Sequence, residues 1–427
     1  MIKIIKDRLS NREEIFSAVM EKVDVSATVK EIIEKVRKEG DSALYYYAEK
    51  FDKAKLSSLR VSEEEIAEAI ASQPSEFIEI LKEAAENIRE FHQKQKNDGF
   101  TLKKSDGIII GQKVIPVDKA GLYVPGGTAA YPSTVLMDAI PAKIAGCKRV
   151  VMVTPPDREG KVNPVILAAA SVAGVDEIYK VGGAQAVAAL AYGTETIPKT
   201  DKIVGPGNAY VAEAKRQVYG EVSIDMIAGP SEIMIVADGK NRAKDIAADL
   251  LSQAEHDRMA SAVLVTDSED FANAVSAELE RQIPLLERRD IARASIDNFG
   301  KIIITRSLDD AIEIANGIAP EHLELCLDEP FEYLEKVRHA GSVFLGRYCP
   351  EALGDYFAGT NHTLPTSGTA RFSSPLSVDD FVKKTQFIYY DKPSLKAVAK
   401  KVEQFATKEG LTAHAKSAVV RFEADDE

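Results

Sequence analysis

Short apolar runs that alternate with helical segments, with glycines at the turns between them, restrict the fold of this chain more than any other feature. In its middle part we expect strands at 148–154, 177–181 and 202–204, and helices at 163–173, at 184–191 and from 208 onward. Such alternation is typical of parallel strands joined by crossover helices. The pattern therefore predicts one Rossmann-like sheet before residue 229.

The same alternation of predicted strands and helices starts again after Gly229. Strands are expected at 232–238, 261–267, 301–305 and 322–327, and helices at 241–256 and 307–316. A chain of 427 residues is also too long for one ordinary core. The predicted fold class is α/β, with two Rossmann-like parallel-sheet domains. We expect them to be interleaved, because no low-complexity linker separates them.

The two ends of the chain are predicted to be helical. Ser62 and Glu65 fit a capping box at a helix start. Near the other end, Ser394 is expected to cap a helix that Gly410 ends, before a short second helix. The predicted parts are an N-terminal helical segment at 1–20, a first Rossmann-like domain at 21–116 plus 229–374, a second at 117–228, and a small C-terminal helical domain at 375–427.

Charge and composition exclude several classes of partner. Lys and Arg number 54 against 67 Asp and Glu, a net charge of −13, so a nucleic-acid partner is not expected. No apolar run is long enough to span a membrane, and the first residues lack the apolar core of a signal peptide. The three cysteines form no C-x-x-C pair, which fits reduced thiols. We therefore expect a cytoplasmic protein.

Two polar clusters at predicted element ends could carry chemistry. Gln253 and His256 lie three residues apart on a predicted helix, so both could bind one metal ion. Glu321 and His322 begin a predicted strand and could transfer protons in one pocket. Strand alternation would put His322, Glu324 and Cys326 on one face. The alternatives, a helix end with a solvated histidine and a strand start that faces water, remain open for each motif alone.

Two further clusters lie toward the end of the chain. Asp355 and His362 stand among glycines, in the kind of loop that often carries a site, although a surface turn capped by Asp355 is an equal alternative. Glu409 and His414 lie at the junction of the two tail helices, where an ordinary helix end is the simpler interpretation. Four of the six histidines fall in these four clusters. Two imidazoles, a carboxylate and an amide oxygen would suit zinc, or else manganese or cobalt.

Three glycine turns flank predicted strands, at 124–127, 181–185 and 205–208. None is a G-x-G-x-x-G, so the standard dinucleotide fingerprint is absent. The residues alone therefore indicate a metalloenzyme with a possible nucleotide site.

Taken together and in order, these segments resemble the histidinol dehydrogenase family. The matching stretches are AGLYVPGG at 120–127, VGGAQA at 181–186, GPGNA at 205–209, IAGPSE at 227–232, QAEHD at 253–257, APEH at 319–322, GDYFAGTNH at 354–362 and EGLTAH at 409–414. The N-terminal helical part resembles the family only in character. The ordered set is specific, although each piece alone is not.

The resemblance implies a role for each of these residues. Zinc would be held by Gln253, His256, Asp355 and His414, and Glu321 and His322 would transfer protons. The substrate would be contacted by Ser231, His362 and Glu409, besides the four zinc ligands and His322, and NAD by Tyr123, Gln185 and Asn208 in the domain at 117–228.

The resemblance also implies the reaction, a four-electron oxidation of L-histidinol through L-histidinaldehyde to L-histidine, the last step of histidine biosynthesis. His322 would take the hydroxyl proton as hydride leaves to NAD, and Glu321 would activate water to attack the aldehyde. A symmetric homodimer with shared sites is implied, in which the tail reaches across. A branch of the family oxidises other small diols. Histidinol is favoured here by the presence of His362, Glu409, His414 and the Glu321–His322 pair.

Two rival functions remain to be weighed. A metal-dependent hydrolase could use Glu321 to activate a zinc-bound water, but it would have no need for the glycine turns of a nucleotide site. A catalytically inactive nucleotide-binding or assembly protein would have no need for the intact Glu321–His322 pair or for four metal ligands.

Overall fold

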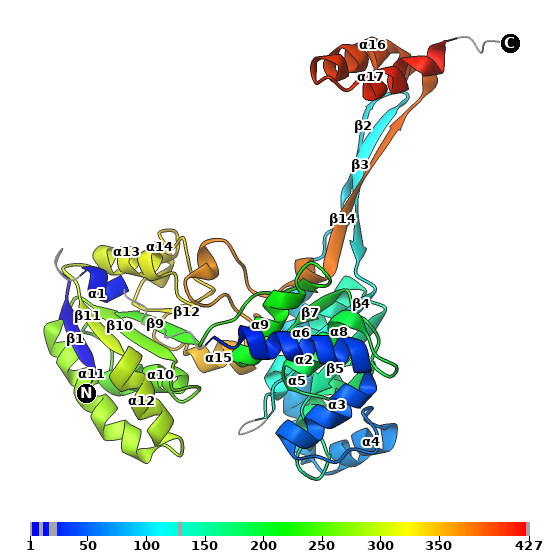
Figure 1. Ribbon diagram of the computed structural model, residues 1–427. Coiled ribbons are helices and arrows are strands. Elements are labelled where there is room, and N and C mark those ends of the chain that lie inside the picture. The colour runs from blue at the N-terminus through cyan, green and yellow to red at the C-terminus, as the bar shows by residue number, and fades with distance from the viewer. Residues whose placement is uncertain (1, 8–11, 17–23, 127–129, 424–427) are drawn as a thin grey trace. The chain divides into compact units, whose positions relative to one another are not determined.

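The computed structural model describes residues 2–7, 12–16, 24–126 and 130–423. The chain divides into two compact units, of which the first comprises Met1–Gln95 and Val117–Phe381 and the second Lys96–Pro116 and Val382–Glu427 (Figure 1). Among the described residues, no helix is both long and apolar enough to cross a membrane.

The first unit contains a five-stranded parallel sheet with the strand order β6-β5-β4-β7-β8. Its strands are β4 (Lys119–Tyr123), β5 (Arg149–Thr154), β6 (Glu177–Lys180), β7 (Lys202–Val204) and β8 (Ser223–Ile224), and its crossover helices are α6 (Pro132–Ala145), α7 (Pro164–Ala173), α8 (Gly183–Tyr192) and α9 (Ala209–Val218). The chain order reverses between β4 and β7, which makes their carboxyl ends the topological switch point. This confirms the first predicted Rossmann-like sheet.

The helices that precede this sheet pack on it. They are α2 (Ser26–Glu39), α3 (Asp41–Tyr47), α4 (Glu63–Ala71) and α5 (Ser75–Gln93). Leu81 and Ile88 of α5 join the core of Leu122, while Val29 and Leu44 join the core of Tyr123. The predicted grouping of 21–116 with 229–374 is therefore wrong for these helices, because their apolar faces are buried on the other sheet. The capping box of Ser62 and Glu65 is confirmed.

The first unit also contains a six-stranded parallel sheet, in the order β1-β11-β10-β9-β12-β13. Its strands are β1 (Lys3–Lys6), β9 (Glu232–Ala237), β10 (Ser261–Thr266), β11 (Lys301–Ile304), β12 (His322–Cys326) and β13 (Ser342–Leu345). The helices around it are α1 (Arg12–Phe16), α10 (Ala243–Ala254), α11 (Glu269–Gln282), α12 (Arg289–Phe299), α13 (Leu308–Ile318), α14 (Pro330–Leu334) and α15 (Glu351–Tyr356). The second Rossmann-like sheet is thus confirmed.

The predicted N-terminal helical segment at 1–20 needs a correction. Lys3–Lys6 form the edge strand β1, which pairs in parallel with β11 and buries Ile2 and Ile5 in the core of this sheet. Arg12–Phe16 are helical as expected, and residues 1, 8–11 and 17–20 lie outside the described part.

The second unit combines a three-stranded antiparallel sheet with two helices. The sheet has the order β14-β3-β2, formed by β2 (Phe100–Ser105), β3 (Ile108–Pro116) and β14 (Val382–Tyr390). The helices α16 (Lys392–Lys408) and α17 (Thr412–Val419) pack on each other. The two tail helices were predicted, but the sheet was not, and residues 96–116 were assigned to another domain. Asp391, not Ser394, caps α16, and its carboxylate accepts from the Ser394 amide at 2.8 Å.

Candidate active site

Both residues of the predicted proton-transfer pair lie at the amino-terminal edge of the six-stranded sheet. Glu321 immediately precedes β12, and His322 is the first residue of that strand, next to the first residue of β9, Glu232. The Glu232 amide donates to Glu321 Oε2 at 2.8 Å, and the Glu232 carbonyl oxygen lies 3.0 Å from His322 Nδ1. One backbone residue therefore orients both side chains. In a neutral ring, Nδ1 donates to this carbonyl and Nε2 is left as the basic nitrogen.

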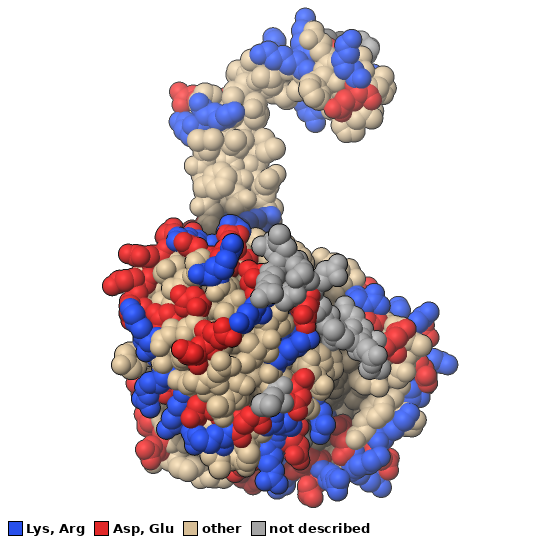
Figure 2. Space-filling view, turned by 90° about the vertical axis from the view of Figure 1, so that its left-hand side faces the viewer, with Lys and Arg blue, Asp and Glu red and all other residues tan. Residues whose placement is uncertain are grey.

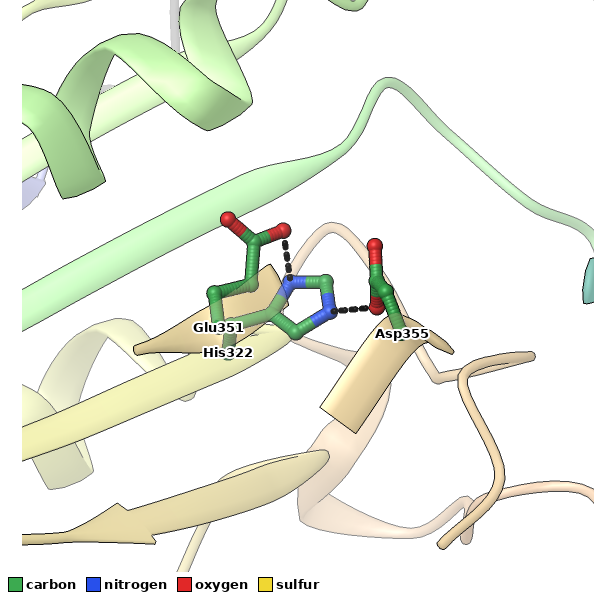
Figure 3. Close-up of side chains that lie close together, drawn as sticks. All are labelled: His322, Glu351 and Asp355. Carbon is green, nitrogen blue, oxygen red and sulfur yellow. Dashed lines mark ion pairs between the residues drawn. The ribbon is translucent and has the colours of Figure 1, made fainter. Parts of the chain in front are cut away.

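Two carboxylates from α15 flank the His322 ring (Figure 3). Glu351 Oε1 lies 3.8 Å from Nδ1, and Asp355 Oδ1 lies 3.7 Å from Nε2. Their spacing of four residues puts both on one face of the helix. Burial lowers the pKa of His322, but the negative charges of Glu321, Asp355 and Glu351 together raise it to about 10. These carboxylates therefore stabilise the imidazolium that results when the ring accepts a proton.

Glu321 is itself buried, with 6% of its surface exposed. Burial raises the pKa of Glu321 to about 8, although the charge of His322 and the Glu232 amide oppose this shift. A carboxyl group with such a pKa can act as a base near neutral pH. Glu321 and His322 thus provide two proton-transfer groups side by side, as the sequence predicted.

Glu351 was not predicted from the sequence; it is 2% exposed and lies beside Nδ1 of His322. Its Oε2 accepts from the Ser252 hydroxyl at 2.8 Å, and its amide donates to Glu324 Oε1 at 2.8 Å. Burial raises the pKa of Glu351 to about 7. The available signal was its position four residues before Asp355. The predicted alternation of β12 is confirmed, because Leu323 packs in one core cluster and Cys326 in another.

Of the predicted metal ligands of the first unit, Gln253 is buried, and His256 and Asp355 are partly buried and interact electrostatically with each other. Burial raises the pKa of Asp355, but its contact with His322 and the charges of His362 and His256 leave it below its ordinary value. These three histidines are therefore electrostatic neighbours of one carboxylate. Gln253 is 1% exposed, and its Oε1 is buried without a hydrogen-bond partner among the described residues. His256 lies just beyond the end of α10, not within the helix as expected.

Two of the predicted site residues do not belong to the first unit. His414 and Glu409 are exposed residues of the second unit. Within the described residues, one group of His, Cys, Asp and Glu is close enough to hold a metal ion: His322, Glu351 and Asp355, whose ligand atoms lie within 4.8 Å of one another. Only Asp355 belongs to both this group and the predicted zinc ligands.

The donor chemistry around Asp355 fits a divalent cation. Imidazole nitrogens, a carboxylate oxygen and an amide oxygen form the mixed N/O set that zinc accepts. The buried Oε1 of Gln253 and Nε2 of His322 lack hydrogen-bond partners among the described residues, as open ligand or substrate positions would.

Two predicted substrate residues of the first unit lie near this centre. His362 has a buried Nε2 without a hydrogen-bond partner in the described part of the chain, and its charge acts on Asp355. Ser231 directly precedes Glu232 at the start of β9, and its carbonyl accepts from the Ser261 amide at 3.0 Å.

The predicted nucleotide residues lie in the five-stranded half. Tyr123 ends β4, and its hydroxyl accepts from the Gly183 amide at the start of α8 at 3.0 Å. Burial raises the pKa of Tyr123 to about 12, so the phenol stays neutral. Gln185 is buried in the first turn of α8, whereas Asn208 is exposed and caps α9 through the Tyr210 amide at 3.0 Å. Gly127 of the first glycine turn lies outside the described residues.

Comparison with known proteins gives a consistent result over almost the whole chain. The family model described as histidinol dehydrogenase matches residues 17–422. The chain is 54% identical over 427 residues to a histidinol dehydrogenase of Clostridium acetobutylicum, covering 99% of both chains. It is 58% identical over 401 residues to one of Bacillus cereus, covering 94% and 93%. The crystal structure of histidinol dehydrogenase from Elizabethkingia anophelis matches with a TM-score of 0.94 and 40% identity, covering 98% of both chains.

Proposed function

Because the chain belongs to the histidinol dehydrogenase family, we propose that it oxidises L-histidinol through L-histidinaldehyde to L-histidine, the last step of histidine biosynthesis. Two molecules of NAD would each accept one hydride. The observation that carries this proposal is the buried Glu321–His322 pair, held by the backbone of Glu232 beside Asp355.

In the first oxidation, His322 accepts the hydroxyl proton of histidinol at Nε2 while the carbinol carbon loses hydride to NAD. The bond from Nδ1 to the Glu232 carbonyl fixes the ring and leaves Nε2 available. The nearby carboxylates stabilise the imidazolium that forms. The products are histidinaldehyde, NADH and one proton.

In the second oxidation, Glu321 removes a proton from water as the water oxygen attacks the aldehyde carbon. The resulting anion of the hydrate loses hydride to a second NAD to give the carboxylic acid, which releases its proton, and L-histidine leaves as the carboxylate. The raised pKa of Glu321 suits it to this step, because a base works best when its pKa is near the working pH. The rest of the site must exclude other water during each hydride transfer.

A zinc ion is proposed to bind Gln253, His256 and Asp355, with His414 as the fourth ligand. This ligand set is supported by the buried Gln253, whose Oε1 has no hydrogen-bond partner among the described residues, and by the charge interaction between His256 and Asp355. When bound, zinc would supply positive charge that lowers the pKa of nearby groups such as His322, and open positions for the imidazole and amine of the substrate.

NAD is proposed to bind at the carboxyl edge of the five-stranded sheet, against Tyr123, Gln185 and Asn208. The strand order reverses between β4 and β7, and glycine turns follow both strands. Such switch points are the usual ligand crevices of α/β sheets, even where the standard fingerprint is absent. The Tyr123 hydroxyl, which accepts from Gly183, keeps its own proton for donation to a ligand.

The active enzyme is proposed to be a homodimer with shared sites. Glu409 and His414 of one chain would then join Ser231, His362 and the other ligands of its partner. The second unit supports this proposal, because Phe100, Ile388 and Phe405 are exposed, with Ile388 at 75%. Uncharged surface covers much of its strands in Figure 2. Exposed apolar surface of this kind marks an interface.

A cytoplasmic location is proposed for the enzyme. Cys147, Cys326 and Cys349 are free thiols, which suits a reducing compartment. On the face drawn in Figure 2, basic and acidic side chains are interspersed, and no continuous basic stripe is visible there.

The decisive experiment counts NADH per histidinol consumed by the purified enzyme. Two NADH and one L-histidine are expected. One NADH with aldehyde release would contradict the four-electron reaction, and none would contradict the proposed activity altogether.

A further inference from the structure

A buried polar network joins the loop that carries His362 to the five-stranded half of the first unit. Asn361 and Thr363, the two neighbours of His362, are 4% and 6% exposed. The Thr363 hydroxyl donates to Asp138 Oδ1 on α6 at 3.0 Å. The Asn361 amide group donates to the Met137 carbonyl oxygen at 2.7 Å.

His92 of α5 adds a further contact to this network. Its Nδ1 lies 2.9 Å from the Ile88 carbonyl oxygen and donates to it, so Nε2 is the acceptor. Asn361 Nδ2 lies 3.3 Å from that Nε2. The Asn361 side chain also accepts from the Thr363 amide at 2.8 Å, which closes the turn around His362. Both neighbours of His362 therefore form hydrogen bonds with α6, and Asn361 also contacts α5.

The glycine turn after β7 lies next to the other oxygen of Asp138, Oδ2, which has no hydrogen-bond partner among the described residues. A Cβ atom added to Gly205 would lie 3.0 Å from Asp138 Oδ2 and would overlap the Tyr123 carbonyl oxygen. The buried pair of Lys215 and Asp225 also holds Gly205. Lys215 Nζ donates to the Gly205 carbonyl oxygen at 3.0 Å, and the Gly205 amide donates to Asp225 Oδ2 at 2.8 Å. Asp138 thus contacts the His362 loop with one oxygen and approaches the turn with the other.

We infer that Asp138 and Thr363 are positioning residues. They fix the position of the His362 loop relative to the Gly205 turn and thereby set the affinity of the enzyme for the amino alcohol. This inference rests on the proposed function, in which His362 contacts the substrate and the turn borders the NAD site. Neither residue touches the reacting atoms. Loss of the Thr363–Asp138 hydrogen bond frees the His362 loop, whereas the Gly205 turn keeps its contacts with Lys215 and Asp225, so the effect is expected in substrate binding and not in NAD binding.

The variant Thr363→Val removes the hydroxyl and keeps the shape of the side chain. We expect the KM for histidinol to rise about tenfold, the factor that corresponds to one lost hydrogen bond of about 1.4 kcal/mol. The Kd for NAD, measured without histidinol, should change less than about twofold. Asp138→Leu should act like Thr363→Val. Asp138→Asn should stay near wild type, because burial raises the pKa of Asp138 and an amide resembles the neutral acid that results.

Thr200→Val is the matched control for a purely structural effect. Thr200 is 1% exposed, and its hydroxyl donates to the Leu190 carbonyl oxygen at 3.0 Å, away from the His362 loop. It should leave the KM for histidinol unchanged. Equal changes in KM for Thr200→Val and Thr363→Val would overturn the inference, as would an unchanged KM in Thr363→Val.

Two further variants cover the case in which Thr363→Val does not fold. Thr363→Ser keeps the hydroxyl and Thr363→Ala loses it, so only the alanine variant should raise the KM. Equal values in the two would again overturn the inference. An inactive wild-type enzyme would instead contradict the proposed function, so the two failures are distinguishable.

Discussion

The Nε2 atom of His322 lies 3.7 Å from the Oδ1 atom of Asp355, so one carboxylate touches the proposed base and also belongs to the proposed zinc site. Asp355 is shared by two possible metal groups, one with Gln253 and His256 and one with His322 and Glu351. Variants of the two groups are expected to differ in metal content, depending on which group binds the metal ion.

His256→Ala should lose zinc, whereas Glu351→Gln should keep it. Removing a direct ligand should lower zinc affinity by more than the roughly 10–100-fold typical of an outer-shell partner. Elemental analysis of the purified variants, after dialysis against a weak chelator, measures this. Glutamine at position 351 keeps an acceptor for the Ser252 hydroxyl, which makes it a matched control. Zinc retained in His256→Ala and lost from Glu351→Gln would assign the metal to the other group.

Glu321→Gln should separate the two oxidations. The variant keeps an oxygen that can accept from the Glu232 amide, but it cannot take a proton from water. NADH formation from histidinol should persist, while oxidation of added histidinaldehyde should fall by about 10² to 10⁴-fold, the usual loss for a general base. Single-turnover NADH absorbance with each substrate measures both steps. A selective role is ruled out if the two steps slow equally.

The aldehyde step should also depend on pH in a defined direction. Glu321 must be ionised to act as a base, and its pKa lies at about 8. The rate should therefore increase as the pH rises through about 8 and level off above it. The residual rate of Glu321→Gln should not follow this profile. A wild-type rate that is flat between about pH 6 and about pH 9 would contradict the assignment of Glu321.

The central strands of the two parallel sheets could be predicted because they are buried on both faces. Such strands read as continuous apolar runs, as residues 233–237 do in β9. The antiparallel sheet of the second unit could not be found in this way. Every residue of β2 is exposed, so this strand lacks the alternation of buried and exposed positions that reveals a half-buried strand.

The site was predictable where motif and chemistry coincide, as at Glu321 and His322. Glu351 was missed because a glutamate at a helix start usually faces solvent and interacts with the helix dipole. Its burial depends on tertiary contacts with Ser252 and Glu324, which lie 99 and 27 residues away. The contacts of Asp138 with Thr363, 225 residues apart, are equally invisible to local patterns.

The three thiols should be dispensable for turnover. An aldehyde can be oxidised through a cysteine thiohemiacetal, but burial raises the pKa of Cys147 to about 12 and that of Cys326 still further. Such thiols are poor nucleophiles. The triple change of Cys147, Cys326 and Cys349 to serine should retain substantial turnover, measured as histidine formed. A folded triple variant that binds histidinol and NAD but forms no histidine would show that a thiol takes part.

Shared active sites should be detectable by complementation between inactive variants. Asp355 lies in the first unit and His414 in the second, and both are proposed ligands of one zinc ion. Homodimers of Asp355→Ala or of His414→Ala should therefore be inactive, because every site lacks a ligand. In a heterodimer of the two, one shared site carries both defects and the other carries none.

The expected recovery follows from counting sites. After random equal mixing, half of the dimers are mixed and half of their sites are intact, so about one quarter of wild-type activity should return. Mass spectrometry of differently tagged chains verifies subunit exchange. If His414 instead joins Asp355 of its own chain, each site keeps one defect and mixing restores nothing. Exchange without recovered activity would thus refute the shared site, while recovery near one quarter requires that His414 reach the partner's zinc.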